Sequence, residues 1–292
     1  MDQATKLREM VQEEQGFSNA RVIAVTSGKG GVGKTSLSVN LAIMLSRMGK
    51  RVVVFDADFG LANVEVMLGI RPRYNLLDVI HNEKRIEEII TEGPNKIGFI
   101  SGGSGVSELA TLDSECIQSL ILELTKLDTM YDVVIIDTGA GITDSVMEFV
   151  MVSPEVLLVV TQEPTSITDA YSLLKVLRRK EKFNPLYKTI HVVANRVDDA
   201  DEGLEIFNKI NTVSTKFLNT KLQYLGAVVQ DRNASMAIIE QKPMVIAFPQ
   251  SQASKDMTQV AYKLMNASQE EYKKNDGIAK VFLNFIRSRK KK

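Results

Sequence analysis

The stretch Gly28-Lys29-Gly30-Gly31-Val32-Gly33-Lys34-Thr35 decides the fold, because it directly follows the apolar, β-branched run Arg21–Thr26. Its glycines let successive backbone N–H groups converge on phosphate oxygens at the positive end of the helix expected next. The closing lysine and hydroxyl complete the pattern G-x-x-x-x-G-K-[ST], in which the lysine reaches the β- and γ-phosphates and the hydroxyl binds Mg²⁺. The predicted nucleotide site includes Gly28, Lys29, Gly30, Gly31, Val32, Gly33, Lys34, Thr35 and Ser36.

The same glycines allow a second interpretation. Gly28, Gly30 and Gly33 also fit the dinucleotide pattern G-x-G-x-x-G, and Asp56 supplies the acid that such a site carries about twenty residues later. The lysine and hydroxyl that end the stretch decide between the two, since a dinucleotide site has no use for a cation and a metal ligand there. The sequence therefore favours phosphate chemistry over redox chemistry.

Short β-branched runs alternate with amphipathic stretches along most of the chain. The expected strands are Arg21–Thr26, Arg51–Phe55, Ile97–Ser101, Val133–Asp137, Val156–Thr161, Thr189–Asn195 and Leu225–Val229, and the expected helices include Lys34–Met48, Ser114–Leu127, Thr165–Arg179 and Leu204–Leu218. This alternation predicts an α/β fold with a mostly parallel twisted sheet and helices on both faces. Ligands of such sheets bind at the carboxyl ends of the strands. One domain is expected over residues 21–270, with an extension at 1–20 and a terminal helix within 271–292.

Two expected strands end in an aspartate, at Asp56 and at Asp137. Phosphoryl transfer needs carboxylates that hold the metal shell and place a water molecule. Asp137 follows a run of apolar β residues and is the expected metal-side group, although a lone aspartate at a strand end is often only a helix cap. Gly139 and Gly141 would let the segment after it move near the γ-phosphate.

Charge and cysteine content narrow the class of protein. Cys116 is the only cysteine, so one chain can form neither an internal disulfide nor a CxxC metal site. No apolar run approaches the roughly 20 residues of a spanning helix, and the N-terminus does not look like a signal peptide, so we expect a cytoplasmic protein. The formal net charge of +0 combines an acidic body with a basic tail. An acidic body argues against a nucleic-acid partner, and none is expected.

Lys29 makes the loop resemble the deviant Walker A motif, K-G-G-x-G-K-[ST], of the MinD/ParA class of P-loop ATPases. The likeness continues through residues 55–63, which look like switch I, and residues 137–141, which look like switch II, and it spans roughly residues 21–265. It implies an ATPase that uses Mg²⁺ and forms a homodimer around ATP. The catalytic residues implied are Lys29, Lys34, Asp58 and Asp137, and the implied metal-site residues are Thr35, Asp56 and Asp137.

The resemblance also assigns individual roles. It implies that Lys29 crosses to the γ-phosphate in the partner subunit and that Asp58 orients the attacking water. Asp56 is expected beside the metal. The pair Asn195-Arg196, which follows an expected strand, is similar to the pair that recognises adenine in this class.

Within the class, the chain resembles the flagellar MinD-like ATPases, the FlhG (YlxH/FleN) family. Gly139 stands where MinD usually has proline, and residues 2–8 resemble the activator motif D-Q-A-x-x-L-R. This likeness implies a switch that regulates flagellar number and placement through the GTPase FlhF and flagellar C-ring switch proteins. The expected activator residues are Asp2, Gln3, Ala4, Leu7 and Arg8. A MinD-type division-site regulator and a ParA-type DNA-partition ATPase remain as alternatives.

Five apolar residues near the C-terminus are spaced as one face of a helix, namely Ile278, Val281, Phe282, Phe285 and Ile286. Basic side chains flank this face, which suits a helix lying in the headgroup plane of an anionic membrane. We therefore expect peripheral attachment to the inner face of the cell membrane in the ATP-bound state. The alternative is a last helix that packs on its own core or on a partner.

Overall fold

The computed structural model describes residues 19–58, 63–103, 112, 114–180, 183, 188–266 and 277–289. The expected activator residues Asp2, Gln3, Ala4, Leu7 and Arg8 lie outside the described residues, as do residues 59–62 of the switch I resemblance.

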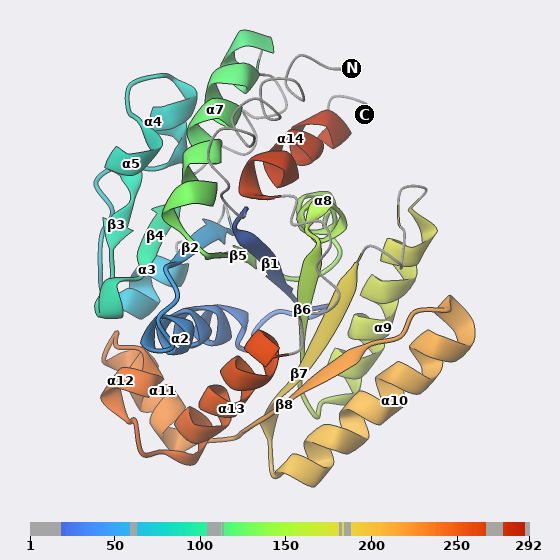
Figure 1. Cartoon of the computed structure of the whole chain (residues 1–292). Coiled ribbons are helices and arrows are strands. Elements are labelled where there is room, and N and C mark those ends of the chain that lie inside the picture. The colour runs from blue at the N-terminus through green and yellow to red at the C-terminus, as the bar shows by residue number, and fades with distance from the viewer. Residues whose placement is uncertain are drawn as a thin grey trace.

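An eight-stranded sheet forms the centre of the molecule, in the order β3-β4-β2-β5-β1-β6-β7-β8 (Figure 1). The strands are β1 (Arg21–Thr26), β2 (Val52–Ala57), β3 (Thr91–Glu92), β4 (Gly98–Ser101), β5 (Val133–Thr138), β6 (Glu155–Val160), β7 (Thr189–Val197) and β8 (Gln223–Val229). Every strand pair is parallel except β3 with β4. The predicted α/β fold with a mostly parallel sheet is confirmed, and each expected strand is present within a few residues of its expected bounds.

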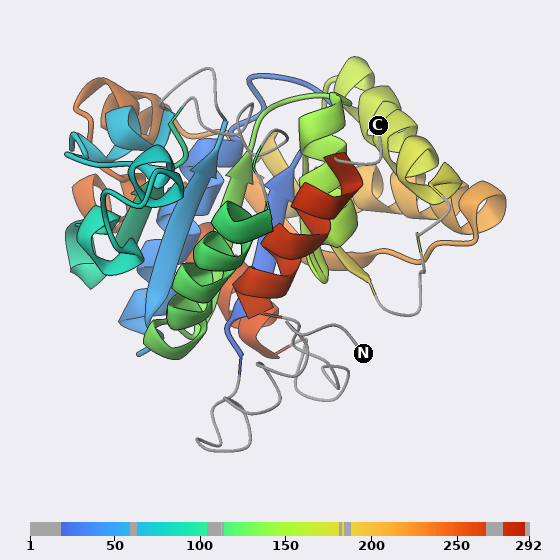
Figure 2. The same ribbon diagram turned by 90° about the horizontal axis from the view of Figure 1, so that it is seen from above.

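Helices cover both faces of the sheet (Figures 1 and 2). Their bounds are α2 (Lys34–Arg47), α3 (Asn63–Leu68), α4 (Leu76–Ile80), α5 (Ile86–Ile89), the 3-10 turn η1 (Pro94–Lys96), α7 (Ser114–Met130), α8 (Asp144–Val152), α9 (Pro164–Arg179), α10 (Ala200–Leu218), α11 (Arg232–Ile239), α12 (Met244–Ala247), α13 (Gln252–Asn266) and α14 (Gly277–Arg289). Side chains of β2 show the layering, since Val52 and Val54 pack with α2 and α13, whereas Val53 and Phe55 pack with α7 and α14. Burial on both faces explains why these strands are continuous apolar runs.

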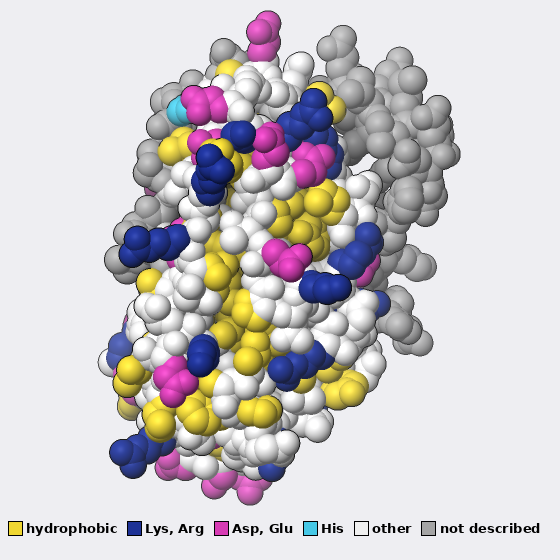
Figure 3. Space-filling model, turned by 90° about the vertical axis from the view of Figure 1, so that its left-hand side faces the viewer, with side chains coloured by type: hydrophobic (Ala, Val, Ile, Leu, Met, Phe, Trp, Pro, Cys, Tyr) yellow, Lys and Arg dark blue, Asp and Glu magenta, His cyan; other side chains and the backbone are white. Residues whose placement is uncertain are grey.

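The face at the left of Figure 1, where β3 ends the sheet, mixes hydrophobic and charged side chains. Figure 3 shows a band of hydrophobic side chains across this face, with lysines, arginines and acids scattered around it rather than gathered by sign. This face therefore presents no uniform field that would steer a charged partner.

Helix α14 packs into the core, which is the alternative that the sequence left open to a membrane-bound helix. The residues expected on its membrane face, Ile278, Val281, Phe282, Phe285 and Ile286, are all buried. They contact the apolar cluster formed by β2, β5 and α7. The apolar face of a helix has the same spacing of residues whether it packs against protein or against lipid. The sequence pattern alone therefore could not distinguish a core helix from a membrane-bound one. In this arrangement the face is not available to a membrane.

Aromatic and polar contacts hold α14 at both ends. Phe282 meets Phe55 edge to face at a centroid distance of 5.1 Å, and Phe285 stacks on Phe149 at 4.1 Å. The backbone N–H of Ile278 donates to Asp128 Oδ1 at 2.8 Å, near the start of the helix. None of the described helices combines the length and hydropathy that crossing a bilayer requires.

The far end of α14 is tied to α8. Arg289 Nε donates to Glu148 Oε2 at 2.7 Å, and both side chains are largely buried. Helix α8 begins shortly after β5, at Asp144, so the segment that resembles switch II leads directly into the element that carries this ion pair. Movement of α8 would therefore act on α14.

Candidate functional site

The predicted site residues meet at the carboxyl ends of the central strands. Asp56 of β2 and Asp137 of β5 are register partners on neighbouring strands, and the loop after β1 leads into α2 beside them. The central strands run upward in Figure 2, so this edge lies at the top of that view. The structure thus gathers at one edge groups that are far apart in the sequence, as expected for a parallel sheet.

Close approach and backbone conformation require glycine in the loop. Gly31 and Gly33 have φ values of +74° and +94°, a region that favours glycine. A Cβ atom on Gly28 would lie 2.2 Å from the carbonyl carbon of Asp169, and one on Gly33 would lie 2.5 Å from Nδ2 of Asn195. The loop is therefore a backbone cradle that side chains would fill, which fits a bound phosphate chain.

Lys34 lies buried at the mouth of this cradle. Its Nζ donates to Ser27 Oγ at 3.2 Å. Burial lowers the pKa of the ammonium, while the charges of Asp137 and Asp58 oppose that shift. A buried ammonium at this end of the loop is placed to form charge-assisted hydrogen bonds to phosphate oxygens.

Two hydroxyl groups of α2 hold Asp137. Thr35 Oγ1 donates to Asp137 Oδ2 at 2.7 Å, and Ser38 Oγ donates to Oδ1 at 2.8 Å. Sequence reasoning missed Ser38, although its place one helical turn after Thr35 puts both hydroxyls on the same face of α2. Because both oxygens of Asp137 accept hydrogen bonds, its orientation at the metal side of the site is fixed.

Asp56 and Asp137 form a buried pair of carboxyl groups. Burial, together with the charge of Asp137, raises the pKa of Asp56 to about 8. Burial also raises the pKa of Asp137 to about 6, against the hydrogen bonds from Thr35 and Ser38. A divalent cation bound beside this pair would stabilise the charged form of both carboxyl groups.

The acids present suit Mg²⁺ that arrives with a nucleotide better than a metal held by protein alone. No cluster of three or more His, Cys, Asp or Glu that could hold a metal occurs among the described residues. Mg²⁺ usually keeps several waters and is bound by one or two carboxylates plus substrate phosphates. Thr35, Asp56 and Asp137 match that smaller set of ligands.

Asp58 lies where the two switch-like segments approach each other. Its backbone N–H donates to Asp56 Oδ1 at 2.9 Å, and its Oδ2 accepts from Asn63 Nδ2 at 3.2 Å. A Cβ atom on Gly139 would lie 3.4 Å from Asp58 Oδ1. The carboxylate of Asp58 is thus held between the segment after β2 and the segment after β5.

Asn195, Arg196 and Lys29 are the remaining residues predicted for the nucleotide site. Asn195 Nδ2 donates to the carbonyl of Val32 at 2.8 Å, which ties the end of β7 to the phosphate loop. Arg196 follows with a φ of +56°. Lys29 points away from the cradle, toward Glu163 and Thr165 at the start of α9.

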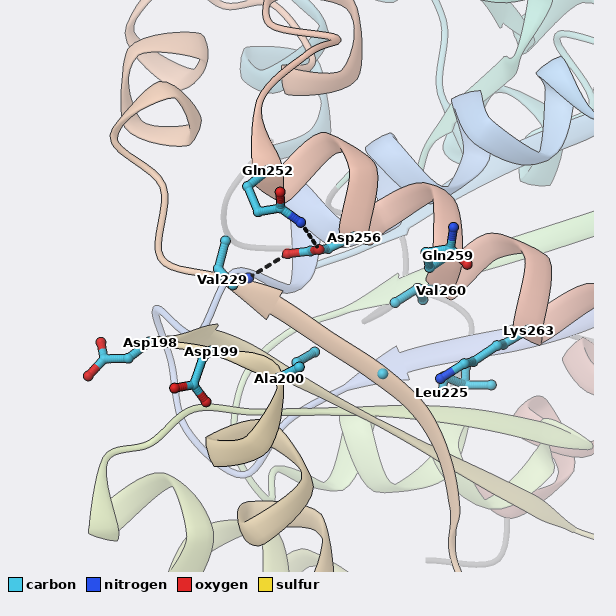
Figure 4. A pocket seen from close by; sticks show the side chains of 12 residues that line it. Asp198, Asp199, Ala200, Leu225, Val229, Gln252, Asp256, Gln259, Val260 and Lys263 are labelled. Carbon is cyan, nitrogen blue, oxygen red and sulfur yellow. Dashed lines mark hydrogen bonds between the residues drawn. The ribbon is translucent and has the colours of Figure 1, made fainter.

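A separate cavity of about 480 Å³ lies between β8 and α13 (Figure 4). No residue of the phosphate site lines it. Within it, Asp256 Oδ2 accepts from the backbone N–H of Val229 at 3.1 Å, and Oδ1 accepts from Gln252 Nε2 at 2.8 Å (Figure 4). Asp256 therefore accepts the hydrogen bond of a backbone N–H group at the outer edge of β8. This contact protects the edge against pairing with another strand.

Comparison with known proteins agrees with this geometry. A family model described as CobQ/CobB/MinD/ParA nucleotide binding domain matches residues 23–244. The antiactivator FleN of Pseudomonas aeruginosa is 42% identical over 244 residues, which are 84% of this chain and 86% of FleN. The flagellum site-determining protein YlxH of Helicobacter pylori is 33% identical over 250 residues, covering 85% and 83% of the two chains.

Solved structures show the same fold. The MinD chain in the MinC:MinD complex of Aquifex aeolicus superposes with a TM-score of 0.66 at 25% identity, covering 85% of this chain and 97% of that one. MinD of Pyrococcus horikoshii in complex with Mg-ADP gives a TM-score of 0.66 at 22% identity, covering 87% of this chain and 100% of its own. The second likeness supports the fold alone.

Proposed function

The chain belongs to the CobQ/CobB/MinD/ParA family of nucleotide-binding proteins and is an ATPase, and from this premise we propose that it acts as an ATP-driven switch regulating flagellar number and placement. The observation that carries the proposal is the arrangement of buried Lys34, Thr35 and buried Asp137 in a chain so similar to FleN and YlxH. YlxH is named as a flagellum site-determining protein and FleN as an antiactivator, whereas the fold alone would fit many family members.

We propose a separate role in ATP hydrolysis for each group of residues in the site. Backbone N–H groups of the loop and the ammonium of Lys34 would bind the β- and γ-phosphates, and Thr35, Asp56 and Asp137 would hold Mg²⁺. Bound Mg²⁺ would neutralise charge that develops on the phosphate oxygens. Asp58 would accept a hydrogen bond from the attacking water and orient it. Asn195 and Arg196, on the other side of the loop, would contact adenine.

Dimerisation completes the site in this proposal. The side chain of Lys29 contacts Glu163 and Thr165 in its own chain, and we propose that it contacts the phosphates of a second copy in the dimer. The partner would be another molecule of the same chain, joined to the first around ATP. ATP would then favour the dimer, because only the triphosphate offers Lys29 a γ-phosphate.

Membrane attachment is the next step of the proposal, and it requires α14 to leave the core. Its five apolar residues are buried, so vesicles can bind them only after the contacts with Asp128 and Glu148 break. Glu148 belongs to α8, which follows the segment that resembles switch II. This position supports the proposal that ATP binding releases α14 from the core. Two released helices in one dimer would bind anionic lipid far better than one.

We expect Glu148→Gln to raise binding to anionic vesicles in the absence of ATP. The change removes the charged partner of Arg289 and should loosen α14 by about 1–3 kcal/mol, since the pair is largely buried. Vesicle flotation of the full-length protein measures the effect. Glu87→Gln, which removes an exposed acid paired with Lys126, is the matched control. Equal flotation of both variants and the unmodified chain would refute control of α14 by this pair.

The N-terminal extension is proposed to act on the GTPase FlhF, and the body on flagellar C-ring switch proteins. A peptide of residues 1–20 should raise the GTP hydrolysis rate of FlhF, because Ala4, Leu7 and a following apolar residue can share one helical face against a groove. Gln3→Ala in the peptide should remove the effect, whereas ATP hydrolysis by the full chain carrying that change should stay normal. Unaltered FlhF turnover would show that the extension is not an activator.

A further inference from the structure

Lys29 occupies a defined site on its own chain. Its Nζ donates to Glu163 Oε2 and, at 2.9 Å, to Thr165 Oγ1. Glu163 directly precedes Pro164, the first residue of α9, yet its side chain makes no capping hydrogen bond to that helix. The carboxylate is thus directed to the lysine of the phosphate loop instead of to its own helix terminus.

We propose that Glu163 and Thr165 form a resting site for Lys29, which Lys29 must leave before it reaches the phosphates of a second copy. This inference rests on the proposed function, in which Lys29 acts across the dimer. It makes Glu163 a positioning residue that acts through Lys29 and holds back dimerisation until a triphosphate is present.

The ion pair between Lys29 and Glu163 is weak enough for Lys29 to leave it readily. The side chains of Lys29 and Glu163 are 36% and 58% exposed, so solvent screens their attraction. The hydrogen bond from Lys29 lowers the pKa of the Glu163 carboxyl, and the charges of Lys29 and Arg196 act in the same direction. Glu163 is therefore ionised at neutral pH. A triphosphate carries more charge than this carboxylate and can take the lysine from it.

The backbone beside the resting site is closely packed, so we expect the side chain of Lys29 to be the part that moves. Gly28 lies so close to α9 that a Cβ atom there would be 2.3 Å from the carbonyl oxygen of Asp169. Backbone contact of this kind fixes the start of the loop against α9. Release of Lys29 then needs only rotation of its own side chain, without separating the loop from the helix.

The test is Glu163→Gln in the full-length chain, with dimer formation measured by light scattering over a range of protein concentrations in Mg²⁺ and AMPPNP. We expect half-dimerisation at a protein concentration about two- to thirty-fold lower, since each dimer vacates two exposed ion pairs. Thr165→Val should shift it in the same direction by less. Glu205→Gln, which breaks the exposed pair with Lys209 on α10, is the matched control and should change nothing.

A merely structural role for Glu163 is tested with two further measurements on the Glu163→Gln chain. Its midpoint of thermal unfolding and its affinity for Mg·ADP should both stay unchanged, because the ion pair that it breaks is exposed and Lys29 is proposed to act only across the dimer. If Glu163→Gln leaves dimerisation unchanged or weakens it while Lys29→Ala still abolishes dimerisation, the resting site is refuted and the proposed function stands. If Lys29→Ala itself dimerises normally, the proposed role of Lys29 fails, and the inference fails with it.

Discussion

Replacing Lys34 by alanine should lower the affinity for Mg·ATP by about 100-fold or more, because charge-assisted hydrogen bonds from a buried ammonium to two phosphates are lost. The loss should be large because Lys34 is buried at the end of the phosphate loop, where its ammonium would meet the β- and γ-phosphates. Titration of the full-length protein with a fluorescent ATP analogue measures the affinity.

The matched control for this change is Lys209→Ala. Lys209 is an exposed lysine on α10, 3.7 Å from Glu205, and takes no part in the site. Its removal should leave nucleotide affinity unchanged. Near-normal binding by a folded Lys34→Ala protein would show that the loop after β1 is not the phosphate cradle.

Asp58→Ala should separate binding from hydrolysis. The carboxylate of Asp58 accepts a hydrogen bond from Asn63 and is proposed to orient water rather than to hold phosphates, so ATP affinity should stay within about three-fold of normal while kcat falls by roughly 10²- to 10⁴-fold. Phosphate release at saturating ATP measures kcat. Asp198→Ala changes an exposed aspartate after β7 and should leave kcat unaltered. If Asp58→Ala turns over at the normal rate, another group positions the water.

The sequence predicts most of the sheet because each central strand is buried on both faces and so is a continuous apolar run, as in Val52–Ala57 and Val133–Thr138. It does not predict β3, whose two residues are too few to show a period. The phosphate cradle could be predicted residue by residue, since its chemistry depends on backbone conformations that only a local pattern of glycines allows.

Other parts of the site depend on contacts that no local pattern records. Glu163 and Lys29 are 134 positions apart in the chain, and only the folding of β6 and α9 brings them together. Ser38 could have been found, because it follows Thr35 by one turn of a predicted helix. For α14, periodicity identified the apolar face of the helix but not the surface that covers it. Phe149 and Phe55, which cover Phe282 and Phe285, belong to distant segments.

We expect ATP to join two copies of this chain around their phosphate loops. Light scattering can measure the mass of the Asp58→Ala protein, first in Mg·ADP and then in Mg·ATP. The expected mass is that of one chain, 32.4 kDa, with ADP and twice that mass with ATP, because the variant binds ATP without consuming it. A single-chain mass at saturating Mg·ATP would show that ATP does not join two copies.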